Sequence, residues 1–194
     1  MEVKYSKDWK QRILKGMRIE SVELSLEDWI ILFLASDGFK GIDGKLKIHF
    51  MLFLYSPFIS VKFRPTFLGV YSEEVELAIR DLILSGYVRK IHRYDDGIKQ
   101  EYVLTERGRS RAIYLMNSIA NKWVLSADKL VVKQGKNILS EIESIKKTYN
   151  NKSNLTILAL LIDKIVEEKH TYLVMDSLEK EILREIINEL KKYK

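Results

Sequence analysis

A switch in the spacing of apolar residues at Gly86 constrains the fold more than any other feature of this sequence. Upstream, residues 72–86 repeat apolar side chains at helical spacing. Downstream, residues 87–94 and 99–104 have strand propensity, and the Asp-Asp-Gly between them is typical of a tight hairpin turn. Thr105 is then placed to cap another helix. The sequence therefore predicts a helix, a β-hairpin and a second helix in succession.

Two more helices are predicted before this switch. Ser25 and Asp28 have the spacing of a capping box at the start of a helix that ends near Gly38. A second helix covers residues 45–55, and Ser72 caps the third. Three helices, a hairpin and a fourth helix are the order of elements in a winged helix-turn-helix domain.

The predicted fold class is mainly α with a small β-hairpin, as a winged helix-turn-helix domain followed by an α-helical C-terminal region. The winged-helix domain is expected at 21–116 and the helical region at 117–194. Residues 1–20 form a basic N-terminal arm or helix, in which Trp9 and Ile13 mark one apolar face.

The C-terminal region is predicted to consist of helices only. Apolar residues in 127–149 follow the spacing of one long amphipathic helix, and 155–166 is apolar all round and is expected to be buried. Asp176 begins a final helix. Because a small winged helix offers limited surface to cover these helices, we expect them to form the interface of a homodimer.

Composition narrows the classes of function. The chain contains no cysteine, which excludes disulfides, thiolate metal sites and a cysteine nucleophile. The longest apolar runs are shorter than the roughly 18–20 residues of a membrane-spanning helix. We therefore expect a soluble cytoplasmic protein without a membrane partner. The net charge of +6 favours a polyanionic partner, or a lysine-rich surface of the kind that thermophile proteins often have.

No motif for catalysis, metal binding or cofactor binding stands out. The three histidines, His49, His92 and His170, fall on separate predicted elements and lack the spacing of metal ligands. The glycine-rich stretch 38–44 follows a helix instead of a strand, and the Gly-Lys pair at its end is followed by Leu46, which does not fit a phosphate-binding loop. We expect no metal, no cofactor and no enzymatic activity.

Three segments carry a resemblance to a known family. They are Lys45-Leu-Lys-Ile-His-Phe-Met-Leu-Phe-Leu54, Leu68-Gly-Val-Tyr-Ser-Glu-Glu-Val75 and Leu104-Thr-Glu-Arg-Gly108. Over about two thirds of its length, the chain resembles archaeal winged-helix proteins of unassigned function, and more distantly the Panacea (SocA-like) antitoxin domain. That family has a proline where this chain has Val70. The resemblance implies the winged-helix fold and a regulatory or protein-interaction role, without catalytic residues.

Basic residues gather around the predicted hairpin and at the start of the helix after it. The candidate DNA-binding residues are Arg89, Lys90, His92, Arg93, Lys99, Arg107 and Arg109, with Arg111 two residues further on. Cations at the tip of such a hairpin reach phosphates or the minor groove. The alternative is an ordinary solvent-exposed hairpin.

The third predicted helix argues against the usual mode of DNA recognition. In helix-turn-helix proteins, the N-terminal residues of this helix reach base edges in the major groove. Here they include Glu73, Glu74 and Glu76, whose carboxylates phosphates would repel. Two hypotheses follow. One is a transcriptional regulator or chromatin-type protein, nucleoid-associated, that binds duplex DNA through its basic hairpin. The other is a protein-interaction adaptor or antitoxin-like module that docks through the acidic helix.

Overall fold

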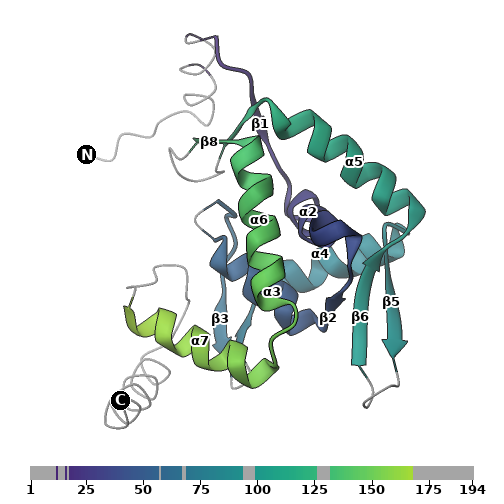
Figure 1. Cartoon of the computed structure of the whole chain (residues 1–194). Helices are drawn as coiled ribbons and strands as arrows, with labels where there is room; N and C mark the ends of the chain where they lie inside the picture. The colour runs from purple at the N-terminus through teal and green to yellow at the C-terminus, as the bar shows by residue number, and fades with distance from the viewer. Residues whose placement is uncertain are drawn as a thin grey trace.

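The computed structural model describes residues 12, 16, 18–56, 58–66, 69–93, 99–125 and 132–167. The apolar face expected in the N-terminal arm, the hairpin turn at 95–97 and the helix expected after Asp176 lie outside these residues. Within them, the chain forms six helices and eight strands of two to six residues. Figure 1 shows α2 near the centre, with α6 on one side of it and α5 on the other.

The first described helix begins and ends as its sequence predicts. In α2 (Leu26–Phe39), the Ser25 hydroxyl oxygen accepts a hydrogen bond from the Asp28 N–H, and the Asp28 carboxylate accepts one from the Ser25 N–H. The helix breaks at Asp37, whose φ of 53° is followed by 65° at Gly38 and 61° at Phe39. These left-handed residues turn the chain into β2 (Ile42–Asp43), and α3 (Lys45–Leu54) follows.

The helix–hairpin–helix succession predicted at Gly86 is present. Helix α4 (Glu73–Leu84) leads into β5 (Val88–Arg93) and β6 (Lys99–Leu104). Helix α5 (Glu106–Ala120) follows, and Thr105 caps it by accepting a hydrogen bond from Gly108 N–H. The helix extends beyond the predicted end near residue 116.

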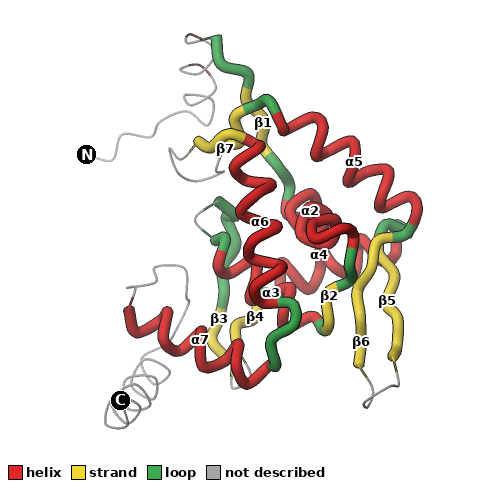
Figure 2. Tube along the Cα trace, viewed as in Figure 1, coloured by secondary structure: helices red, strands yellow, loops and turns green. Residues whose placement is uncertain are grey.

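Six short strands were not predicted. Three of them, β1 (Ser21–Glu23), β2 and β7 (Trp123–Leu125), pair with segments far away in the sequence. Strand β2 pairs antiparallel with β6, giving a three-stranded sheet in the order β2-β6-β5. A second sheet joins β1, β7 and β8 (Val132–Gln134). Strands β3 (Arg64–Thr66) and β4 (Gly69–Tyr71) form a small hairpin before α4. Figure 2 shows the β5–β6 hairpin projecting from the helical body.

The prediction of one helix across 127–149 was wrong in its N-terminal part. Residues 132–134 form β8, and α6 (Gly135–Tyr149) begins after them. Strand β8 pairs with β7, which pairs with β1 near the start of the described chain, so a tertiary contact sets the local structure here. Helix α7 (Asn154–Glu167) matches the predicted segment, but it is not buried all round, because Leu155 is 78% exposed.

One core extends from the α2 region into the C-terminal helices. Seven consecutive residues of α2, from Trp29 to Ala35, are buried, so this helix is covered on all sides. Ile138 and Ile142 on α6, and Ile157 and Leu161 on α7, belong to the same cluster. The chain itself therefore covers the apolar side of α6, and covering this side requires no second copy.

Candidate nucleic-acid interface

The β5–β6 hairpin divides its basic residues between two faces. Side chains directly opposite each other in an antiparallel pair point to the same side. Arg89 pairs with Val103 and Ile91 with Glu101, which places these four on one face. On the other face, Lys90 pairs with Tyr102, and His92 pairs with Gln100. The candidate residues on β5 therefore form two separate surfaces.

The face that carries Arg89 borders a cavity of about 440 Å³. The end of α2 supplies Phe39 and Lys40 to its lining, and α5 supplies Arg109. The guanidinium carbon of Arg109 lies 5.6 Å from the centre of the Phe39 ring, which is a cation–π contact. Two of the predicted DNA-binding residues, Arg89 and Arg109, therefore meet at this cavity although they come from different elements.

The opposite face carries Lys90 and His92, both exposed. Nearer the body of the protein, Tyr102 on this face is buried in the core. The outer part of the hairpin thus exposes basic residues to solvent, while its inner end is anchored in the core. Arg93 and Lys99 pair across the hairpin in register at its outer end. For Arg93 and Lys99, the structure describes the backbone but not the side chains.

Two of the arginines at the start of α5 have structural partners. Arg107 donates to the carbonyl oxygen of Ser85 at 2.9 Å, and its guanidinium lies 4.5 Å from the centre of the Tyr87 ring. Arg111 forms an ion pair with Asp28 at 2.9 Å. Arg107 remains exposed, but these contacts tie it to the end of α4. It is therefore less free to follow a ligand than a side chain on the outer hairpin.

Of the three glutamates predicted at the start of α4, Glu76 is held by other residues. Its Oε1 atom accepts a hydrogen bond from the Lys45 side chain at 2.8 Å, and its Oε2 atom lies 3.6 Å from His49 Nε2. Glu73 and Glu74 are exposed. Lys45 thus offsets the charge of Glu76, and the other two carboxylates face solvent.

The side-chain cap predicted at Ser72 is absent, and His49 instead holds the backbone of Ser72 at the start of α4. The Ser72 side chain makes no capping hydrogen bond, whereas the Ser72 N–H donates to His49 Nδ1 at 3.1 Å. The imidazole is fully buried and stacks on Tyr71. Burial lowers the pKa of His49 to about 4, against the attraction of Glu76. His49 is therefore neutral at pH 7, with Nδ1 as the acceptor.

A set of buried polar residues was missed by sequence reasoning. Lys146 on α6 is fully buried and donates to three carbonyl oxygens at the end of α2, those of Leu34, Ser36 and Lys40. Burial lowers the pKa of Lys146 to about 8. Amphipathic spacing gives no sign of this role, because the partners lie more than 100 residues away.

Asn150 and Lys47 hold the end of α6 against β2. The Asn150 side-chain amide donates to Gly41 O at 2.8 Å and accepts from Asp43 N–H at 3.4 Å, so it pairs with the β2 segment much as a strand would. Lys47 donates to the Asn150 carbonyl oxygen at 2.5 Å. These bonds fix α2, β2 and α6 relative to one another beside the β5–β6 hairpin.

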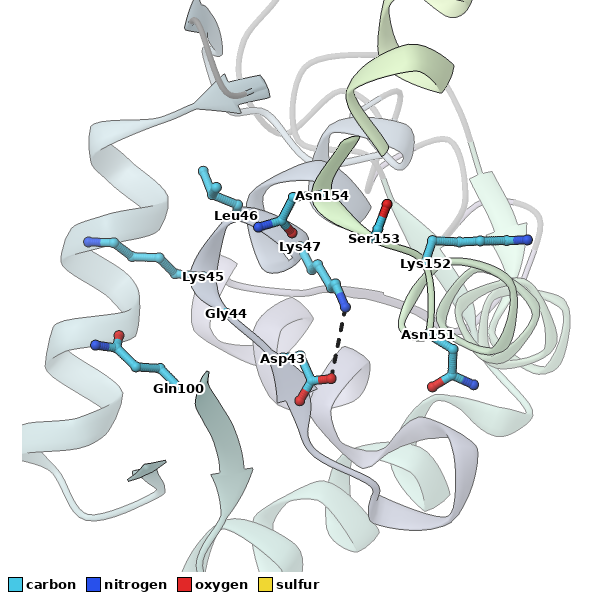
Figure 3. Close-up of a pocket in the computed structure, with 10 residues that line it drawn as sticks. All are labelled: Asp43, Gly44, Lys45, Leu46, Lys47, Gln100, Asn151, Lys152, Ser153 and Asn154. Atoms are coloured by element: carbon cyan, nitrogen blue, oxygen red, sulfur yellow. Dashed lines mark ion pairs between the residues drawn. The ribbon is translucent and has the colours of Figure 1, made fainter. Parts of the chain in front are cut away.

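A larger hollow of about 700 Å³ lies between the start of α3 and the start of α7. Figure 3 shows Lys47 pointing toward Asp43, with which it forms an ion pair at 3.9 Å. Lys45 and Lys152 point away to opposite sides. The lysines that line this hollow therefore do not converge on one ligand position.

Comparisons with known proteins give no further information on the site. No family model, no curated protein and no solved structure matches the chain. Among the described residues, no helix is both long and apolar enough to cross a bilayer. The same residues contain no group of three or more metal-ligating side chains.

Proposed function

We propose that the chain is a winged-helix protein that binds duplex DNA through the β5–β6 hairpin, as a transcriptional regulator or chromatin-type protein. The observation that carries the proposal is the position of the basic hairpin. It is the outer part of the β2-β6-β5 sheet, it directly follows α4, and Lys90 and His92 are exposed on it. The order α2, β2, α3, α4, β5, β6 supports a winged helix with this hairpin as the wing, although the small β3–β4 hairpin separates α3 from α4.

The proposed contact is to the sugar–phosphate backbone. Lysine side chains supply charge without the bidentate geometry that reads a base. The exposed Glu73 and Glu74 make the start of α4 a poor fit to the major groove, because two carboxylates would face phosphates there. Binding should therefore depend strongly on salt and weakly on sequence.

Titrating a fluorescent random-sequence duplex over a range of salt concentrations tests this proposal. Replacing Lys90, Arg93 and Lys99 together by Gln should weaken binding. It should also reduce the slope of log K against log salt by up to about 0.9 for each lost phosphate contact. Lys136→Gln is the control, because Lys136 is an exposed lysine at the start of α6, away from the hairpin. If the triple variant and the wild type have the same affinity and slope, the hairpin is not the contact.

A protein-interaction role is the second candidate, and exposed leucines on α4 favour it. Leu77 is 44% exposed next to the acidic first turn of the helix, and Leu84 is 76% exposed at its C-terminal end. An adaptor or antitoxin-like module would dock through this apolar and acidic face. If the wild-type chain does not bind the duplex at low salt, this second candidate replaces the first.

We also propose that the protein forms a homodimer through its C-terminal helices. The support that remains in the described chain is Leu155 of α7, a large apolar side chain that is 78% exposed. Light scattering over a range of concentrations measures the mass of the assembly. A dimer that Leu155→Lys converts to monomer supports this interface, and a mass that stays monomeric at tens of micromolar contradicts it.

A further inference from the structure

We propose that the cavity between the hairpin, the end of α2 and the start of α5 is a phosphate-binding cleft in which Arg89 and Arg109 hold the anionic group. This cleft lies on the face of the hairpin opposite Lys90 and His92. The inference does not depend on the proposed DNA contact at Lys90 and His92. The phosphate group could belong to a phosphorylated small molecule or to a nucleic-acid backbone. The experiment below distinguishes these two sources.

The first argument is the convergence of cations from separate elements. Arg89 comes from β5, Arg109 from α5 and Lys40 from the end of α2, and all three are exposed at the cavity lining. Lys40 also forms an ion pair with Asp37 at 3.4 Å, so the two arginines carry the argument. In the described part of the chain, neither guanidinium forms an ion pair with a carboxylate. Arginine forks match phosphate oxygens in geometry and charge. Two such groups without a carboxylate partner at one cavity are placed to bind a tetrahedral anion.

The second argument is that the carboxylates at the same cavity have cationic neighbours of their own. Asp43 forms an ion pair with Lys47 at 3.9 Å. The buried Glu101 carboxylate lies near enough to the buried Lys146 ammonium to attract it, although burial has the larger effect on the pKa of Lys146. The charge of both carboxylates is thus partly offset, and the half-exposed Asp43 faces three exposed cations of the lining, Arg89, Arg109 and Lys40.

The third argument is the rigidity and size of the cleft. Phe39, which supports Arg109, has a φ of 61°, a conformation that a bulky residue adopts only where its surroundings impose it. Lys146 holds this segment on both sides of Phe39 by donating to the carbonyl oxygens of Ser36 and Lys40. The volume of about 440 Å³ falls within the range of small-molecule sites. The cleft is therefore preformed and large enough for a phosphate group with a small substituent.

Two titrations of the full chain test the cleft. Isothermal titration calorimetry measures the binding of inorganic phosphate and of a nucleoside monophosphate, with sodium chloride at matched ionic strength as the control for charge screening. Fluorescence anisotropy measures binding of the random-sequence duplex. The variants are Arg89→Gln, Arg109→Gln and Arg109→Lys, which keeps the charge but loses the fork. Lys136→Gln is the control. Circular dichroism confirms that each variant is folded.

A phosphorylated small molecule is the ligand of the cleft if phosphate or the nucleotide binds saturably. This binding should be weakened about tenfold or more by Arg89→Gln and by Arg109→Gln, but not by Lys136→Gln. If neither compound binds, and both arginine variants reduce the salt slope of duplex binding, the ligand of the cleft is a phosphate group of the nucleic-acid backbone. The proposal is overturned if neither probe responds to the arginines, or if the small molecules bind equally well to the variants.

The same data separate this proposal from the proposed function. Lys90→Gln should weaken binding of the duplex and leave binding of phosphate unchanged, because Lys90 points to the other face of the hairpin. Phosphate binding through Arg89 without any duplex binding would support the cleft and contradict the DNA contact. Duplex binding that depends on Lys90 and not on Arg89, with no phosphate binding, would support the DNA contact and contradict the cleft.

Discussion

The side-chain nitrogen of Lys146 lies 2.9 Å from the carbonyl oxygen of Leu34, a residue 112 positions earlier in the chain. The ammonium group also donates to two more carbonyls at the end of α2. The last carbonyls of a helix lack partners within the helix, and a cation is favourable at that end. Lys146 therefore acts as a cap supplied by α6 for α2.

Replacing Lys146 by Met should reduce the free energy of unfolding by about 1–3 kcal/mol, because buried carbonyl groups lose their donor. Urea unfolding followed by circular dichroism measures the change. The control is Lys147→Met, at an exposed neighbour that pairs with Glu143 on the same helix, which should change stability by less than about 0.5 kcal/mol. Equal unfolding midpoints for the two variants would contradict the capping role.

Stability should fall in acid through His49. The pKa of its imidazole is about 4 in the folded chain, against 6.5 for an unperturbed histidine, so the unfolded chain binds the proton more tightly. The contribution is therefore fully present above pH 6.5 and is lost as the pH falls through 4. Full loss amounts to about 3 kcal/mol. His49→Gln keeps an acceptor for Ser72 N–H and should flatten the pH dependence, whereas His92→Gln, at an exposed site, should not. If stability depends on pH in the same way in the wild type and in both variants, this prediction is wrong.

Gly108→Ala should destabilise the junction between the hairpin and α5 by about 1–3 kcal/mol. A Cβ atom at this position would collide with the backbone carbonyl oxygen of Tyr87, which cannot move without disturbing the start of β5. Ser110→Ala, at an exposed position two residues further along the same helix, is the control. A thermal unfolding temperature for Gly108→Ala equal to that of the control would show that the backbone yields without cost.

Replacing Glu73 and Glu74 by Gln should change affinity for the random duplex by less than tenfold at roughly 0.15 M salt, because α4 lies outside the proposed contact. Glu76 is left unchanged, since it bonds to Lys45. Anisotropy titration gives the affinity. A gain of tenfold or more, about 1.4 kcal/mol, would place the start of α4 in the major groove instead.

Local signals were sufficient for the elements around Gly86. The cap at Thr105, the capping box at Ser25 and the change from helical to strand spacing all act over a few residues, so they are legible in the sequence. The two- and three-residue strands were missed because so short a segment has no periodicity. Strand β2, for example, is defined by its pairing of Ile42 with Tyr102.

The candidate site divides in the same way. The sequence by itself placed the basic residues on a hairpin, because strand alternation and the turn composition are local properties. It also determined the acidic start of α4 and the apolar spacing on α6. Only the tertiary structure decided that Arg89 and Arg109 meet at one cavity, that His49 bonds to the backbone of Ser72 at the start of α4, and that Lys146 caps α2. Each of these arrangements brings together residues at least 20 positions apart in the sequence, and their positions depend on how the elements pack.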